Sequence, residues 1–171
     1  MTQASDLKSN VVIASTAEFS RTEAWELYSD VVMGGVSESS FQVNTSGAGV
    51  FSGRVSTENN GGFAGVRFAT HVTGVLHKRI QIDLTGDSKS YQFRIKHKPS
   101  DTYAYVFSFT TSGRREVLSL DLDEFKARYR GKDMDMPPFT ETSIGEIGFL
   151  IAAKINEEFR LQIHSISIQK E

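Results

Sequence analysis

Hydrophobic and polar residues alternate over many short stretches of this chain, and the 3.6-residue spacing of a long helix is almost absent. In 80–84, for example, isoleucine or leucine occupies every second position, with polar residues between them. This period of two places one set of side chains on the core face of a β-strand and the other set on the solvent face. About ten such stretches, separated by turns, predict an antiparallel β-sandwich or barrel, and no segment supports a βαβ unit. The expected strands cover 11–13, 25–27, 39–43, 51–55, 63–68, 80–84, 91–95, 103–109, 118–122, 146–153 and 159–168.

Four segments depart from simple alternation. Residues 146–153 are apolar at nearly every position, which is typical of a central strand covered on both faces. Apolar residues occupy odd positions in 159–163 and even positions in 166–168, so a regular strand cannot bury both sets, and we predict a β-bulge or bend near His164-Ser165. Single helical turns are expected after Ser15, which has a capping-box glutamate three residues later, and over 123–128 with Asp123 as cap.

Two glycine pairs bracket the stretch 30–68, and both lie in polar loops between predicted strands. Glycine suits positions that need a positive φ or a close approach of the backbone. Because the intervening strands are expected to be hairpin neighbours, the loops 30–35 and 58–62 should lie side by side at one end of the sandwich. We favour tight structural loops over a ligand site, and both interpretations stay open. The candidate binding residues are Asp30, Met33, Gly34, Gly35, Ser37, Thr57, Glu58, Asn59, Asn60, Gly61, Gly62 and Arg67.

Arg67 follows the second glycine loop by a few residues. If the two loops meet, its guanidinium could pair with Asp30 or Glu58 as a two-pronged donor. One interpretation is a polar anchor in a recognition groove. The favoured interpretation is that Arg67 holds the loop 58–62 from within.

The glycine loops also carry a resemblance to a known family, in Met33-Gly34-Gly35-Val36-Ser37 and in 56–63, with Arg67 following. The sequence resembles the complex I intermediate-associated protein 30 family. Further matches are Trp25, Asp30, Gly86, Tyr91, Arg130-Gly131, 147–149, Phe159, Leu161, Ile163 and Ile166. The resemblance implies a jelly roll of the galactose-binding-domain-like type, also used by carbohydrate-binding modules. It further implies a role in building respiratory complex I (NADH:ubiquinone oxidoreductase) by holding an assembly intermediate. The family commonly has two consecutive acids before Met-Gly-Gly, whereas the second position here is Val31.

Length, composition and charge limit the number of domains and the classes of partner that the chain is expected to have. At 171 residues the chain is expected to form one domain over 11–171, with a mobile tail over 1–10. A net charge of −2 gives no bulk attraction for nucleic acid or an anionic membrane, and no apolar run approaches the length of a membrane span. The first ten residues lack the features of a secretory signal or transit peptide, so the chain is either a mature fragment or, as we favour, a cytoplasmic protein.

No catalytic motif appears. The four histidines are scattered, no His-Glu-x-x-His or Gly-x-Ser-x-Gly sequence is present, and the glycines do not match a nucleotide-binding loop. The sequence therefore predicts no enzyme activity, no cofactor and no transition-metal site. A structural calcium is the one metal left open, although the spacing of its candidate ligands fits no EF-hand loop. These ligands are Asp121, Asp123, Asp133 and Asp135.

Two functions follow from these observations. The first is a non-enzymatic protein-binding module that resembles a complex I assembly factor, and the alternative is a glycan-binding module. Tyr103, Tyr105, Phe107 and Phe109 share one face of a strand and could stack on sugar rings, although core packing is the favoured interpretation. Exposure of Tyr91, Tyr103 and Tyr105 would discriminate between the two functions.

Overall fold

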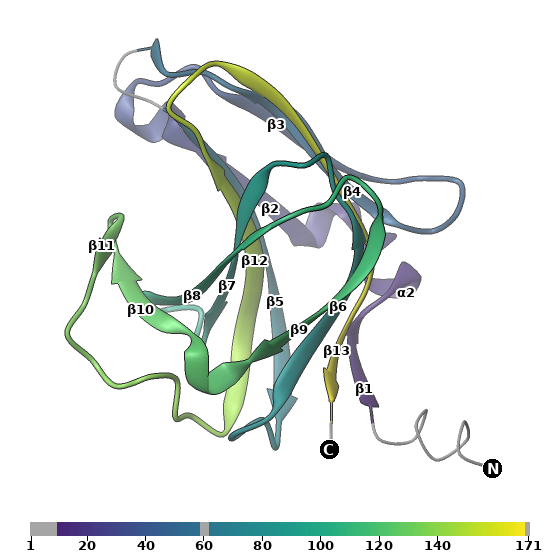
Figure 1. Ribbon diagram of the computed structural model, residues 1–171, viewed down its shortest axis with the longest axis vertical. Coiled ribbons are helices and arrows are strands. Elements are labelled where there is room, and N and C mark those ends of the chain that lie inside the picture. The colour runs from purple at the N-terminus through teal and green to yellow at the C-terminus, as the bar shows by residue number, and fades with distance from the viewer. Residues whose placement is uncertain (1–9, 59–61, 170–171) are drawn as a thin grey trace.

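The computed structural model describes residues 10–58 and 62–169 and consists of two antiparallel β-sheets packed face to face (Figure 1). The six-stranded sheet has the order β3-β4-β13-β6-β9, and β1 also pairs with β13. Its strands are β1 (Asn10–Ala14), β3 (Glu38–Val43), β4 (Gly49–Val55), β6 (Arg79–Thr85), β9 (Arg115–Asp121) and β13 (Glu157–Gln169). The predicted antiparallel, jelly-roll-type sandwich is therefore confirmed.

The seven-stranded sheet has the order β11-β10-β8-β7-β12-β5-β2. Its strands are β2 (Trp25–Ser29), β5 (Phe63–Thr73), β7 (Ser90–Lys96), β8 (Ala104–Thr110), β10 (Lys126–Tyr129), β11 (Lys132–Asp133) and β12 (Ser143–Ala152). As the apolar run predicts, β12 is central, between β7 and β5. Short helices α2 (Thr16–Phe19), η1 (Thr22–Ala24), η2 (Asp30–Met33) and η4 (Leu122–Glu124) connect the strands, and no helix among the described residues could span a membrane.

Aromatic side chains join the two sheets. Trp25 of β2 stacks between Phe41 of β3 and Phe68 of β5, with ring centroids 4.6 and 4.5 Å apart. Its indole Nε1 donates a hydrogen bond of 2.9 Å to the carbonyl of Glu18 in α2. Because α2 has the predicted capping box, this hydrogen bond fixes the end of a preformed turn against the core.

The phase change in the last strand is resolved by the predicted irregularity. The pairing of β13 with β6 shifts register between Ile163 and Ser165. One extra residue at this point turns the following side chains to the opposite phase, so Ile163 and Ile166 are both fully buried. The residues expected in the central strands are also buried: Phe149, Ile151, Phe159, Leu161 and Ile163.

One local prediction was wrong. Residues 123–128 do not form a turn capped by Asp123, because Asp121 caps the shorter helix η4 and the chain then enters β10. The strands β10 and β11 are too short for a period-two pattern to reveal them. The predicted tail falls outside the described residues except for its last residue, Asn10. This residue begins β1 and pairs with Gln169 of β13.

Replacing Phe159 tests the assignment of strand faces. Its ring lies 4.9 Å from that of Phe51 and 6.4 Å from that of Tyr91, between the sheets. Phe159→Ala is expected to lower the free energy of unfolding by about 3–5 kcal/mol, because it removes buried apolar surface and leaves a cavity. Chemical denaturation measures this change, and a value near zero would show that the faces of β13 are misassigned.

Candidate functional site

The side chain of Asp30 connects the two glycine loops. Its carboxylate is fully buried and accepts hydrogen bonds from the Ser37 amide (3.0 Å) and the Ser37 hydroxyl (2.5 Å). It also accepts hydrogen bonds from the amides of Gly62 (2.6 Å) and Phe63 (3.3 Å) in the second loop. The predicted side-by-side arrangement of the two loops is therefore confirmed.

The glycines allow the chain to close around this carboxylate. A side chain at Gly35 would place its Cβ 2.4 Å from the Asp30 Cγ, so no larger residue fits there. Gly62 has φ of +137°, a conformation that other residues rarely adopt, and this directs its amide at Asp30. The Ser29 hydroxyl caps η2 by accepting a hydrogen bond from the Val31 amide.

Four donors outweigh burial in setting the ionisation of Asp30. Burial alone would raise the pKa of this carboxyl, but the hydrogen bonds from the Ser37 hydroxyl and from the amides of Gly62, Ser37 and Phe63 stabilise the charged form. The net result is a pKa below the ordinary value for aspartate. The group is therefore a structural anion at neutral pH, and its oxygens are already occupied by the chain's own donors.

A third loop, 153–156, completes this end of the sandwich. We call the surface formed by 30–37, 56–58, 62–63 and 153–156 the clamped loop end. The Asn156 side chain accepts hydrogen bonds from the Thr57 amide (2.8 Å) and hydroxyl (3.0 Å). The Ala153 amide donates to the Gly62 carbonyl (2.8 Å), and the Ser56 amide donates to the Ser37 hydroxyl (2.9 Å). Polar groups of all three loops thus bond to each other, and the side chains of Val31, Val36 and Ile155 are exposed.

The candidate residues divide into interior and exterior groups. Asp30, Gly35, Ser37 and Gly62 are buried and hold the loops together. Gly34 and Glu58 are exposed, and Thr57 is half-buried. Asn59, Asn60, Gly61 and the side chain of Met33 lie outside the described residues. Apolar residues that were not among the candidates are also exposed here, at 60% for Val31, 46% for Val36 and 66% for Ile155.

The prediction for Arg67 was wrong. Its Nε donates a hydrogen bond of 2.6 Å to Glu26 on β2, directly across from it, and its guanidinium lies over the ring of Tyr28. Both partners lie on the outer face of the seven-stranded sheet, whereas Asp30 is buried in the interior. The five residues from Gly62 also carry Arg67 roughly 16 Å along β5, well away from the loop.

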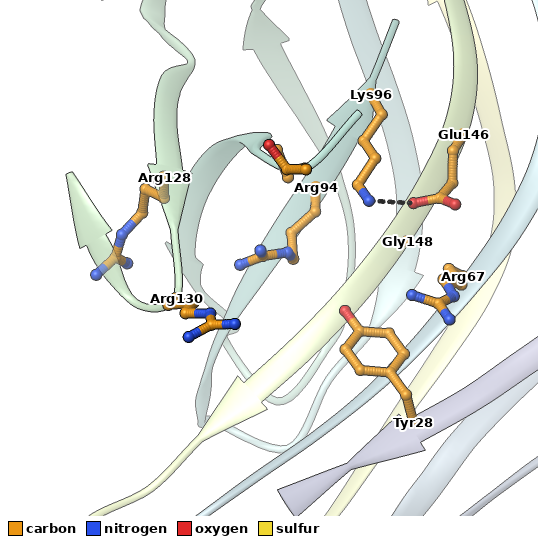
Figure 2. A pocket seen from close by; sticks show the side chains of 10 residues that line it. Tyr28, Arg67, Arg94, Lys96, Arg128, Arg130, Glu146 and Gly148 are labelled. Carbon is orange, nitrogen blue, oxygen red and sulfur yellow. Dashed lines mark ion pairs between the residues drawn. The ribbon is translucent and has the colours of Figure 1, made fainter. Parts of the chain in front are cut away.

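A second feature, which the sequence did not predict, is a cationic pocket on the outer face of the seven-stranded sheet (Figure 2). The small cavity, of about 100 Å³, is lined by five cationic side chains, Arg67, Arg94, Lys96, Arg128 and Arg130, together with Glu146, Tyr28 and the backbone of Gly148. These residues come from β2, β5, β7, β10, β12 and the turn after β10. Because the strands are distant in sequence, local periodicity shows only that their side chains point outward.

The aromatic row and the candidate metal ligands do not form a site. Tyr91 and Tyr105 are 2% and 7% exposed, and Tyr103 and Phe107 pack against the core, so the aromatic row faces inward. Among the residues that the structure describes, no three His, Asp or Glu side chains are grouped to hold a metal ion. Of the candidate calcium ligands, Asp123 pairs with His77 and Asp133 with Arg128.

The pKa of Asp30 makes acid stability a test of its role. Because folding lowers this pKa, the carboxylate stabilises the fold fully above the unfolded value of about 3.9, and this contribution is lost as the pH falls through the lower folded value. Asp30→Asn should lower the free energy of unfolding at pH 7 by about 3 kcal/mol, since an amide cannot accept from all four donors. It should also flatten the loss of stability below pH 4 seen by urea denaturation.

The half-exposed Asp123 provides the matched control for this measurement. Asp123→Asn removes the same charge from the surface and should change stability by less than about 1 kcal/mol. Equal losses for the two variants would show that the buried carboxylate does not hold the loops.

The architecture resembles that of carbohydrate-binding modules. A family 11 module from Clostridium thermocellum, in complex with a β-1,3-1,4-mixed-linked tetrasaccharide, superposes with a TM-score of 0.69 at 17% sequence identity, covering 93% of this chain and 94% of that one. The family 11 module of the cellulosomal cellulase Lic26A-Cel5E from the same organism gives 0.63 at 19% identity, over 85% and 86% of the two chains. A mutant of a family 29 carbohydrate-binding module gives 0.54 at 10%, over 94% and 91%. At these identities the likeness shows the fold alone.

Sequence comparison provides the family. A search against curated protein sequences finds no significant match. The family model described as complex I intermediate-associated protein 30 matches residues 14–163, which include both glycine loops, the cationic pocket and β12, the central strand of the seven-stranded sheet. The chain therefore belongs to the complex I intermediate-associated protein 30 family.

Proposed function

We propose that this domain is a non-enzymatic protein-binding module that holds an assembly intermediate of respiratory complex I, and that it does so through the clamped loop end. The carrying observation is the exposure of Val31, Val36 and Ile155 on loops that are bonded to one another. Single exposed apolar residues are common on protein surfaces, but several on adjoining loops indicate an interaction site. The family to which the chain belongs is named for association with such intermediates.

The clamp suits these loops for binding another protein. An interface loses affinity when binding must first order its loops, and preorganised loops avoid most of that cost. Here the buried Asp30 carboxylate and the Asn156 side chain fix the backbones that carry the three apolar residues. In sequence, Met33 lies between Val31 and Val36. The family commonly has a second acid at the position of Val31. Because this position is exposed, the carboxylate of Asp30 alone is sufficient for the clamp.

Glycan binding remains the alternative, supported by the likeness to carbohydrate-binding modules. Stacking of a sugar ring needs an exposed aromatic face. The inward direction of the aromatic row, with Tyr91 and Tyr105 buried, counts against this function. Protein binding needs only an exposed mixed surface, which the clamped loop end provides.

Partner capture from the source cell, followed by mass spectrometry, tests the proposal. The double variant Val31→Ser, Ile155→Ser should recover at least about tenfold less complex I subunit than wild type, because it removes apolar anchors from the interface. Its melting temperature should barely change, since both side chains are exposed. Val117→Ser, which alters a valine 61% exposed on β9 of the six-stranded sheet, should leave capture intact.

Two outcomes would contradict the proposal. One is equal recovery of complex I subunits by wild type and the double variant. The other is tight, saturable binding of a neutral β-glucan tetrasaccharide with no enrichment of any complex I subunit, which would favour the glycan-binding alternative.

A further inference from the structure

The cationic pocket is centred on a position of the seven-stranded sheet that has no side chain. Gly148 of β12 lies directly across from Arg67 of β5 on one side and from Arg94 of β7 on the other. Residues opposite each other in adjacent strands project from the same face of the sheet. Two guanidinium side chains therefore flank a position that has no side chain, and this position forms part of the pocket floor (Figure 2).

Only some of the cationic side chains in this pocket form ion pairs with described carboxylates. Three cations have acidic neighbours, in the pairs Arg67–Glu26, Lys96–Glu146 and Arg128–Asp133. Arg94 is half-buried, and its guanidinium donates to the Gln92 side chain (2.7 Å) but forms no ion pair with any described residue. The Arg130 guanidinium lies over the ring of its neighbour Tyr129 and forms no ion pair among the residues that the structure describes. A half-buried guanidinium that is not held in a close ion pair is a strong donor for an incoming oxyanion.

Tyr28 supplies a neutral donor at the edge of the same pocket. Its ring lies against the backbone of Gly65 on β5, and its hydroxyl points toward the space between Arg67 and Arg94 (Figure 2). Burial holds the pKa of Tyr28 above its ordinary value, and the nearby arginines oppose this only in part. The hydroxyl therefore keeps its proton and can donate a hydrogen bond to a bound anion.

We propose that this pocket binds one carboxylate side chain from an acidic segment of a protein partner. The inference rests on the proposed function, because it supplies a second contact for the same kind of partner, on the sheet face instead of the loop end. The planar fork of a guanidinium matches a carboxylate in two parallel hydrogen bonds. A cavity of about 100 Å³ has room for such a group and not for a folded element.

The surroundings of the pocket disfavour an acidic sugar as the bound anion. An acidic sugar would need an aromatic face for stacking, but the Tyr28 ring has the backbone of Gly65 against it and the Arg67 guanidinium over it, 4.9 Å from its centroid. An aspartate or glutamate side chain needs no such face.

Titration of the isotope-labelled protein with capped hexaglutamate, followed by nuclear magnetic resonance, tests this inference. The amides of Gly148 and Arg94 should shift saturably, and the shifts should weaken as salt screens the charges. Arg94→Gln and, separately, Arg130→Gln should weaken binding at least about tenfold. Arg54→Gln removes the same charge from an exposed position on β4 of the opposite sheet and should change affinity less than about twofold.

The inference is overturned if hexaglutamate shifts amides across both sheets, or if Arg94→Gln and Arg54→Gln bind equally well. It is also overturned if inorganic phosphate or trigalacturonate shifts the Gly148 amide at lower concentration, because the pocket would then suit that anion. The variant Val31→Ser, Ile155→Ser should bind hexaglutamate like wild type. A failure of the loop surface and a failure of the pocket are therefore separate results.

Discussion

The buried carboxylate of Asp30 is the interaction on which this end of the molecule depends. It receives four hydrogen bonds, two from its own loop and two from the loop that begins β5. Buried charge is costly unless such partners surround it, and here donors of the chain itself satisfy both oxygens. The loops are therefore held by one charged group, and loss of that charge would leave several buried donors without an acceptor.

The clamp also relates the two proposed contact surfaces. Asp30 directly follows β2, and Gly62 directly precedes β5, so the carboxylate closes the end of the β2–β5 pair. The same pair carries Tyr28 and Arg67, which line the cationic pocket further along the sheet. Because β2 is an edge strand, its position depends on β5 and on the closure at Asp30. The apolar loop surface and the pocket thus share one rigid support.

Local patterns were sufficient to predict most of the fold. Period-two alternation located the long strands, and the change of phase in 159–168 located the bulge between Ile163 and Ser165. The glycine pairs identified the two loops that meet. The strand β10 was missed because it has only four residues and follows acidic residues that imitate a helix start.

The candidate site was only partly predictable, because sequence does not show which strands become neighbours. Arg67 was assigned to the nearby loop, yet its partner Glu26 lies on a strand 41 residues earlier. The pocket was missed for the same reason. Gly148 can be recognised as part of a pocket only when Arg67 and Arg94 are known to flank it. Asp30 was predicted as a binding residue, but it is buried and holds the two loops together from inside.

Amide hydrogen exchange at Gly62 tests the central claim most directly. If the Asp30 carboxylate holds the two loops, the Gly62 amide opens only when the fold does, and it should exchange as slowly as the amide of Phe149 in the central strand β12. Exchange at the rate of an unprotected loop amide, while Phe149 stays protected, would contradict the account.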